Sequence, residues 1–388
     1  MTGHISGLDA RMVLDSRGQP TVEVDCFVDG ALSGRAIVPS GASTGAYEAL
    51  ELRDGDPSMY LGKGVSAAVN NVKDRIERAL VGLPVDEQRI IDDAMIKLDG
   101  TPNKSELGAN AMLGASMACL HAGARLHELP LWKYIGGASG GLMPVPMLNI
   151  LNGGAHAASN VDVQEFMVMP HGFDTFQEGL RAGVETYHAL KAELKKDGLL
   201  GGVGDEGGFA PNLPANEDGL KYMVRAIEGA GYSTEEIGIA LDVASTEFLK
   251  DDGYHMDGKV LSSDDLVELY GGWLDRYPIL SIEDGFGEDD WRGWSSFTKA
   301  YGHRVQTVGD DLFVTQSERL SQGIELGAAN AMLVKVNQVG TVSETLEAMD
   351  LASTNGMNNV VSHRSGESED VTIADFAEGT RAGQIKTG

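Results

Sequence analysis

A lysine stands near the end of a short apolar run, residues 331–337 (AMLVKVN), at the point where a parallel β-strand is expected to end. Burial removes an ammonium group from water and lowers its pKa, and in this way an enzyme can obtain a lysine base. Taken alone, Lys335 is more often a structural lysine, with a buried stem and a charge that reaches solvent or a partner. Its role therefore has to be judged from the residues that accompany it.

Several other apolar runs in the second half of the chain also finish on an ionisable residue. These residues are Asp242, Glu283, Asp310, His363 and Lys386. From Glu283 onward, each is separated from the next by about the length of one strand and one helix, and helical patterns at 317–326 and 342–352 lie between them. Repeated units of this kind predict a parallel sheet, and a closed barrel brings the C-terminal ends of its strands around one mouth. We therefore expect three acids, two lysines and a histidine to converge there.

Chain length and local patterns indicate which elements position these residues. At 388 residues the chain fits a barrel of ~250 residues with a smaller domain attached. Residues 4–38 have the alternation of an antiparallel meander, helical spacing follows over 65–126, and the glycine-rich segment 136–141 marks a boundary. The predicted fold class is α/β, with an α+β domain at 1–140 and a TIM-type β/α barrel at 141–388.

The composition excludes several classes of partner. The formal net charge is −28, from 58 acidic and 30 basic residues, so nucleic acid and anionic membranes are poor partners. No apolar run approaches the ~20 residues of a membrane-spanning helix, the N-terminus lacks a signal-peptide pattern, and the two cysteines are far apart in sequence. We expect a cytoplasmic protein in which local cations must attract any anionic substrate.

The acids at the predicted mouth suggest a metal site. Asp242, Glu283 and Asp310 offer only hard oxygen ligands, which suit magnesium or manganese rather than zinc. Each acid alone would usually be a solvated or salt-bridged group, but three of them at one mouth repel one another unless a cation lies between them. A magnesium ion there, with Lys335 and Lys386 nearby, could stabilise an enediolate formed by proton removal next to a carboxylate.

Seven motifs, in chain order, resemble the enolase family. They are VLDSRG (13–18), GASTG (41–45), GDEGG (204–208), SIED (281–284), GDDL (309–312), VKVNQ (334–338) and SHRSGE (362–367). Each is weak alone, but together they are specific and cover nearly the whole chain. The resemblance implies phosphopyruvate hydratase activity, the reversible dehydration of 2-phosphoglycerate to phosphoenolpyruvate in glycolysis and gluconeogenesis. A lysine or histidine base with one or two magnesium ions is the established pattern of this superfamily.

The resemblance also implies a role for each matching residue. Lys335 would be the base that removes the C2 proton, and Glu206 the acid that helps the 3-hydroxyl leave. Two Mg²⁺ ions are implied, with Asp242, Glu283 and Asp310 as ligands of the first and Ser43, on a loop that closes over the substrate, as a ligand of the second. The implied substrate-binding residues are His156, Gln164, Glu165, His363, Arg364, Ser365 and Lys386.

The resemblance has one departure and leaves three alternatives open. The family continues past QIKTG (384–388) with a further strand and helix, and this chain stops there. Either the sequence is trimmed or the barrel lacks its final closing element, and Lys386 lies near enough to the end of the chain to fray. A homodimer or higher homo-oligomer is implied. The alternatives are a related barrel enzyme acting on another carboxylate, a two-metal phosphatase, and an inactive enolase-like binding or structural protein. Arg364 and Ser365 argue against the first, a lysine base against the second, and the intact set of ligands and base against the third.

Overall fold

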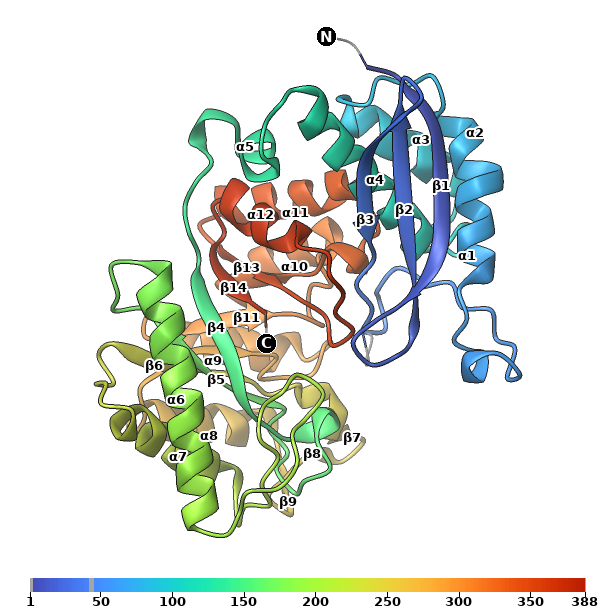
Figure 1. The fold of residues 1–388 in the computed structure, drawn as a ribbon. Coiled ribbons are helices and arrows are strands. Elements are labelled where there is room, and N and C mark those ends of the chain that lie inside the picture. The colour runs from blue at the N-terminus through green and yellow to red at the C-terminus, as the bar shows by residue number, and fades with distance from the viewer. Residues whose placement is uncertain (1–2, 42–44, 388) are drawn as a thin grey trace.

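The alternating residues near the N-terminus form the predicted antiparallel meander (Figure 1). Its strands are β1 (Ile5–Leu14), β2 (Pro20–Val28) and β3 (Ala31–Ile37). The loop between β2 and β3 is the pair Asp29 and Gly30, both with positive φ, which is the geometry that lets a two-residue turn match the twist of the strands. The computed structural model describes residues 3–41 and 45–387.

Helices cover one face of this sheet. They are α1 (Ser66–Asn71), α2 (Glu77–Leu80), α3 (Gln88–Asp99) and α4 (Ala109–Leu126), with the π-helical turn η2 (Val72–Ile76) between the first two. Helix α4 packs closely on the strands because its contact residues are small. A Cβ atom at Gly34 would lie 2.0 Å from the carbonyl oxygen of Ala118, so only glycine fits there. Helix α5 (Leu131–Gly136) then leads towards the barrel.

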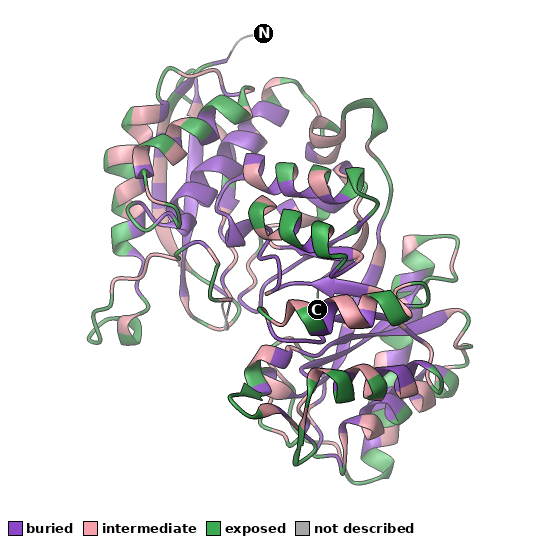
Figure 2. Cartoon of the chain, turned by 180° about the vertical axis from the view of Figure 1, so that it is seen from behind, coloured by how far each residue is buried: buried purple, intermediate pink, exposed green. Residues whose placement is uncertain are grey.

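Eight strands close into the barrel that the sequence predicts. In order around the ring they are β4 (Val145–Asn152), β5 (Glu165–Pro170), β6 (Ile237–Asp242), β10 (Ile279–Glu283), β11 (Gln306–Gly309), β12 (Ala331–Val334), β13 (Asn358–Ser362) and β14 (Gly383–Lys386). The barrel interior is filled by an apolar cluster that includes Met147, Met167 and Leu333. Figure 2 shows buried residues along the strands and the inner faces of the helices, and exposed residues on the outer faces.

One strand differs from the predicted parallel sheet. Strand β5 is antiparallel to both of its neighbours, β4 and β6. The connection from β4 to β5 is the short segment 153–164, whose only helical turn is η4 (Gly154–His156), and a parallel crossover needs a longer connection, usually a helix. Because β5 is reversed, its first residue, Glu165, lies at the same mouth as the last residues of the other strands.

The outer helices follow the strands in chain order. They are α6 (Phe176–Lys196), α7 (Asn216–Gly229), α8 (Ser263–Leu274), α9 (Trp291–Tyr301), α10 (Ser317–Leu326), α11 (Val342–Thr354) and α12 (Thr372–Gly379). A small sheet of β7 (Leu249–Lys250), β8 (Gly253–Met256) and β9 (Lys259–Leu261) lies between β6 and α8. Among the described residues, no helix combines the length and apolar character needed to cross a bilayer.

The strand that carries Lys386 closes the barrel. Strand β14 pairs in parallel with β13 on one side and β4 on the other, and Lys386 is 2% exposed. Of the two alternatives, a barrel that lacks its closing element is therefore wrong, and Lys386 is not frayed, because hydrogen bonds on both sides hold the strand. The boundary at residue 140 stays a prediction.

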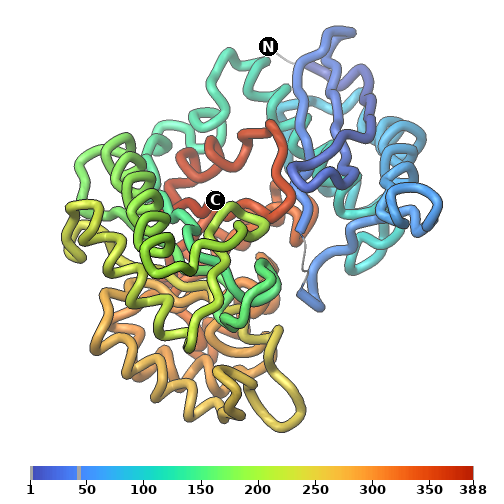
Figure 3. The backbone as a smooth tube through the Cα atoms, turned by 60° about the horizontal axis from the view of Figure 1, so that its bottom comes forward, coloured from blue at the N-terminus to red at the C-terminus, as the bar shows by residue number. Residues whose placement is uncertain are grey.

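The C-terminal part of the barrel lies against the N-terminal sheet. In Figure 3 the red segment runs beside the blue one, and Ser40 and Gly366 form a β-bridge between them. Further along the interface, the Asp92 carboxylate of α3 accepts a hydrogen bond of 2.9 Å from the backbone N–H of Ser343 in the first turn of α11. A side chain from the N-terminal half therefore caps a barrel helix.

Candidate active site

Strand register places three acids side by side at the barrel mouth. Glu165 on β5 pairs with Asp242 on β6, and Asp242 pairs with Glu283 on β10. The ammonium group of Lys386 reaches all three: its Nζ lies 3.0 Å from Glu165 Oε2, 3.2 Å from Asp242 Oδ2 and 2.9 Å from Glu283 Oε1. None of these four residues is more than 4% exposed. One buried cation therefore serves three buried carboxylates.

The pKa shifts in this row reflect the excess of negative charge. Burial and the charge of Asp242 raise the pKa of Glu283 well above its ordinary value, and burial and Glu206 raise that of Glu165. Burial by itself would lower the pKa of Lys386, but the charges of Glu165, Glu283 and Asp242 raise it well above the ordinary lysine value. Each carboxylate is repelled by its neighbours, whereas the lysine is attracted by all of them.

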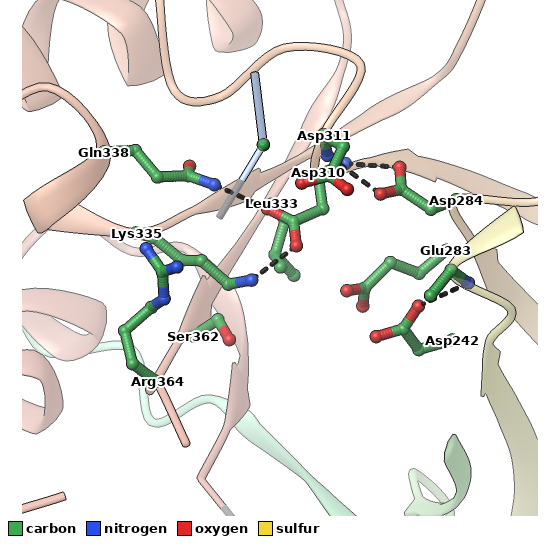
Figure 4. Close-up of polar contacts among 12 residues, drawn as sticks. Asp242, Glu283, Asp284, Asp310, Asp311, Leu333, Lys335, Gln338, Ser362 and Arg364 are labelled. Carbon is green, nitrogen blue, oxygen red and sulfur yellow. Dashed lines mark hydrogen bonds and ion pairs between the residues drawn. The ribbon is translucent and has the colours of Figure 1, made fainter. Parts of the chain in front are cut away.

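Asp310 and Lys335 form a separate ion pair next to this row (Figure 4). Lys335 Nζ contacts Asp310 Oδ2, while the side-chain amide of Gln338 donates a hydrogen bond of 2.8 Å to Asp310 Oδ1. Burial opposes ionisation of Asp310, but the charge of Lys335 lowers its pKa. Burial also opposes the charge on Lys335, yet Asp310 raises the pKa of this lysine above its ordinary value. Burial does act to lower the pKa of Lys335, but the net shift is upward, because the ion pair with Asp310 outweighs desolvation.

Two further acids lie beside Asp310, and neither was among the predicted site residues. The Asp284 carboxylate accepts hydrogen bonds from the backbone N–H groups of Asp310, at 2.9 Å, and Asp311, at 2.8 Å, as Figure 4 shows. Burial and the neighbouring acids raise the pKa of Asp284 well above its ordinary value and that of Asp311 to about 8. The sequence could have indicated both residues as part of the site, because they directly follow Glu283 and Asp310, and a second acid at a strand end lies at the same barrel mouth.

Glu206 reaches the mouth from the loop 201–208 and lies close to Glu165. Its side chain, 5% exposed, lies 3.4 Å from His363 Nε2 and 3.9 Å from His156 Nδ1, and it accepts a hydrogen bond of 3.0 Å from the amide of Asn149. Burial favours the neutral acid, but the positive charges of His363, His156 and Lys386 lower the pKa of Glu206 well below its ordinary value. These charges therefore favour the ionised form of this carboxyl group.

The remaining side chains of the mouth come from both halves of the chain. Arg364, after β13, makes a two-point ion pair with Glu48 at 2.9 and 3.2 Å and donates to the side chain of Asn337 at 2.9 Å. The hydroxyl of Ser365 accepts a hydrogen bond of 3.2 Å from the guanidinium group of Arg17. Gln164 donates to Asp242 Oδ2 at 3.3 Å. No local pattern in the sequence marks Glu48 as a site residue, and Ser43 lies outside the described residues.

These side chains surround one small cavity at the barrel mouth. The predicted site residues that line it are His156, Gln164, Glu165, Glu206, Asp242, Asp310, Lys335, His363, Arg364, Ser365 and Lys386. Glu283 contacts the cavity residue Lys386. The lining also includes Gly41, Glu48, Ala244, Glu247, Asp284, Asp311 and Ser362, which were not among the predicted site residues.

The donor groups at this mouth fit a divalent metal ion. Among the described residues, two triads have ligand atoms that all lie within 4.8 Å of one another: His156, Glu165 and Glu206, and Asp284, Asp310 and Asp311. The expected set of Asp242, Glu283 and Asp310 is not one of these triads: Asp242 and Glu283 contact Lys386, whereas Asp310 contacts Lys335. Carboxylate oxygens dominate, and carboxylates outnumber the lysines, which is the environment that hard cations require.

The fold and the site define a barrel enzyme that combines acid–base side chains with a metal site at one mouth. The family model described as enolase, N-terminal domain, matches residues 5–135, and the model described as enolase, C-terminal TIM barrel domain, matches residues 141–388. The enolase of Bifidobacterium animalis subsp. lactis (strain AD011) is 56% identical over 387 residues, which cover 99% of this chain and 90% of that protein. The chain belongs to the enolase family.

Membership establishes the class of reaction. The enzyme is a hydro-lyase that interconverts 2-phosphoglycerate and phosphoenolpyruvate, a glycolytic step with a small-molecule substrate and a metal cofactor. The predictions of fold class, family and activity made from the motifs are therefore confirmed.

Proposed function

We propose that Lys335 is the base at C2 of 2-phosphoglycerate and that Glu206 is the acid at the 3-hydroxyl. The observation that carries this assignment is that the two groups line the same cavity but come from different elements, Lys335 after β12 and Glu206 from the loop 201–208. The dehydration needs both groups, because a base removes the proton from one carbon and an acid protonates the hydroxyl that leaves the next.

We propose Mg²⁺ as the metal, with two ions in each active site. Asp242, Glu283 and Asp310 would hold the first ion and Ser43 the second; the support is the oxygen-only donor set at the strand ends. When bound, these ions would engage the carboxylates, weaken the hold of Asp310 on Lys335, and withdraw charge from the substrate carboxylate.

For the reaction, Lys335 and Glu206 must each take a protonation state different from the one favoured in the substrate-free structure. Lys335 carries a proton in its ion pair with Asp310, and it must lose that proton to act as a base. Glu206 is ionised beside His363 and His156, and it must gain a proton to act as an acid. A substrate with several negative charges would raise the pKa of Glu206, since like charges disfavour ionisation.

The substrate would be held by the remaining polar residues of the cavity. Arg364 and Ser365 would bind the phosphate, because a guanidinium fork and a hydroxyl match its oxygens. Lys386 would bind the carboxylate and stabilise the charge that develops on it. The residues that would complete the polar network are His156, Gln164, Glu165 and His363.

We also propose a cytoplasmic location and a homodimer or higher homo-oligomer. The N-terminal sequence, which has no signal-peptide pattern, and the two cysteines far apart in sequence support the first, and the family resemblance supports the second. Light scattering coupled to size-exclusion chromatography would measure the mass of the assembly.

The decisive experiment is the dehydration assay with Lys335→Ala. Phosphoenolpyruvate absorbs in the ultraviolet through its enol double bond, so its formation from 2-phosphoglycerate can be followed with and without Mg²⁺. We expect a Mg²⁺-dependent rise with the wild-type chain and its loss in Lys335→Ala, while Lys299→Ala, an exposed lysine on α9, retains full activity. Dehydration by Lys335→Ala at the wild-type rate would exclude Lys335 as the base.

A further inference from the structure

The loop after β11 has a backbone conformation that needs an explanation. Val314 and Thr315 have φ values of 43° and 55°, in the left-handed region that β-branched residues rarely adopt. Both residues are completely buried. Strain of this kind persists only where the surrounding structure maintains it, and it is concentrated at functional sites. The contacts of the Thr315 side chain show what this conformation achieves.

The hydroxyl group of Thr315 lies between two residues of the proposed active site. It accepts a hydrogen bond of 3.1 Å from the backbone N–H of Lys335. Its own proton is then directed to Gln338 Oε1 at 2.6 Å, since the other acceptor within reach, the carbonyl oxygen of Leu333, is 3.5 Å away. A hydroxyl has one proton to donate, so the shorter contact determines its direction.

This hydrogen bond determines which end of the Gln338 amide faces the acids. With Oε1 held by Thr315, Nε2 points the other way and donates to Asp310 Oδ1 at 2.8 Å; it also lies 3.4 Å from Glu48 Oε1 (Figure 4 shows the contact with Asp310). The side chain of Gln338 is completely buried, so water cannot substitute for either contact. Lys335 contacts the second oxygen of Asp310, and both oxygens of that acid therefore have a defined partner.

We propose that Thr315 is a positioning residue for the dehydration. Its hydroxyl orients the Gln338 amide so that the N–H group of the amide, and not its oxygen, faces the Asp310 carboxylate. The same hydroxyl also accepts a hydrogen bond from the backbone N–H of Lys335 and so fixes the backbone at that residue. The left-handed backbone at Val314 and Thr315 places the hydroxyl between these two residues. This inference rests on the proposed roles of Asp310 as a metal ligand and Lys335 as the base.

The experiment compares Thr315→Val with Thr315→Ser in the full-length chain. Valine keeps the shape and the β-branch but removes the hydroxyl, whereas serine keeps the hydroxyl. The first readout is the affinity for Mg²⁺ alone, measured by titration calorimetry without substrate. Loss of a residue that orients a metal ligand typically costs about tenfold or more in metal affinity. We expect that loss in Thr315→Val and wild-type affinity in Thr315→Ser.

A double-mutant cycle with Gln338→Leu tests whether Thr315 acts through Gln338. If it does, Thr315→Val adds no further loss of Mg²⁺ affinity in the Gln338→Leu background. Additive losses, or wild-type Mg²⁺ affinity in Thr315→Val or in Gln338→Leu, would overturn the proposal. If Thr315→Val fails to fold, Gln338→Leu alone carries the test, because the same loss is required of it.

A second readout separates this inference from the proposed function on which it rests. Exchange of the C2 proton of 2-phosphoglycerate with deuterated water, followed by NMR, reports the base step. We expect slower exchange in Thr315→Val and the wild-type rate in Thr315→Ser. Asp310→Asn and Lys335→Ala are measured alongside: wild-type Mg²⁺ affinity in the first or wild-type exchange in the second would refute the proposed roles themselves. Normal losses in those two variants, with no effect in Thr315→Val, would refute only the role of Thr315.

Discussion

Replacing Lys386 with methionine would test whether its positive charge stabilises the folded protein by compensating the buried acids at the barrel mouth. The ammonium group lies 2.9 to 3.2 Å from oxygens of Glu165, Asp242 and Glu283, and all four residues are at least nine-tenths buried. Removing one partner of a buried ion pair costs about 3–5 kcal/mol, because the remaining charge has neither water nor a counter-ion. We expect Lys386→Met to lower the free energy of unfolding by about that amount at neutral pH, in the presence of a chelator. Methionine retains most of the apolar stem, so the loss reports the charge.

The same variant should have a characteristic pH dependence. Burial and neighbouring charges already raise the pKa values of Glu165 and Glu283 above the ordinary 4.5, and loss of the ammonium group raises them further. Between that ordinary value and the raised folded value, the folded variant holds protons that the unfolded chain has released. Its stability therefore increases as the pH falls through this window, and the deficit relative to wild type shrinks.

Urea unfolding in a neutral and in a mildly acidic buffer would measure both effects. The matched control is Lys221→Met, because Lys221 is exposed and pairs with a single acid, Asp218, at 2.7 Å. A surface pair of that kind contributes less than about 1 kcal/mol. An unfolding free energy for Lys386→Met equal to that of wild type would refute the reasoning. A deficit of the same size at both pH values would also refute it.

Two further predictions concern Glu206 and the cysteines. In Glu206→Gln, we expect kcat for dehydration to fall by about 10²–10⁴-fold, because the proposed acid is lost. Exchange of the C2 proton should still be detected by NMR, because Lys335 is intact. Equal losses of the dehydration rate and the exchange rate would contradict separate roles for Glu206 and Lys335. The thiols of Cys26 and Cys119 are completely buried with their sulfur atoms 3.8 Å apart, and their hydrogen bond together with burial raises the pKa of Cys119 well above its ordinary value. A thiolate-specific reagent should therefore label neither cysteine in the native protein and both in denaturant, and mass spectrometry showing native labelling would contradict this.

The N-terminal half completes the active site rather than only covering it. Glu48 neutralises the guanidinium group of Arg364 through two contacts, and Arg17 holds the hydroxyl of Ser365. Both proposed phosphate-binding residues are therefore positioned by side chains that precede them in the chain by 316 and 348 residues. A phosphate group would meet an arginine whose orientation is already defined, and this lowers the entropy lost on binding.

Local sequence determined the barrel and the groups at most of its strand ends. Apolar runs that end on Asp242, Glu283 or Lys386, separated by helical patterns, specify strand–helix units, and such units bring those ends to one mouth through backbone geometry alone. The chemistry of the residue types then suggested a metal site and a lysine base, and the ordered motifs indicated the enolase family.

Only the tertiary structure decided how these groups pair. Reversal of β5 aligned Glu165 with Asp242, closure of β14 on β4 brought Lys386 to three acids, and the ion pair with Asp310 raised the pKa of Lys335 when burial alone would have lowered it. The contact of Thr315 with Gln338, like that of Glu48 with Arg364, joins positions distant in sequence. Strand direction, register and charge pairing depend on packing between segments that are distant in sequence. The residue pattern within one segment does not show which residue of another segment will lie next to it.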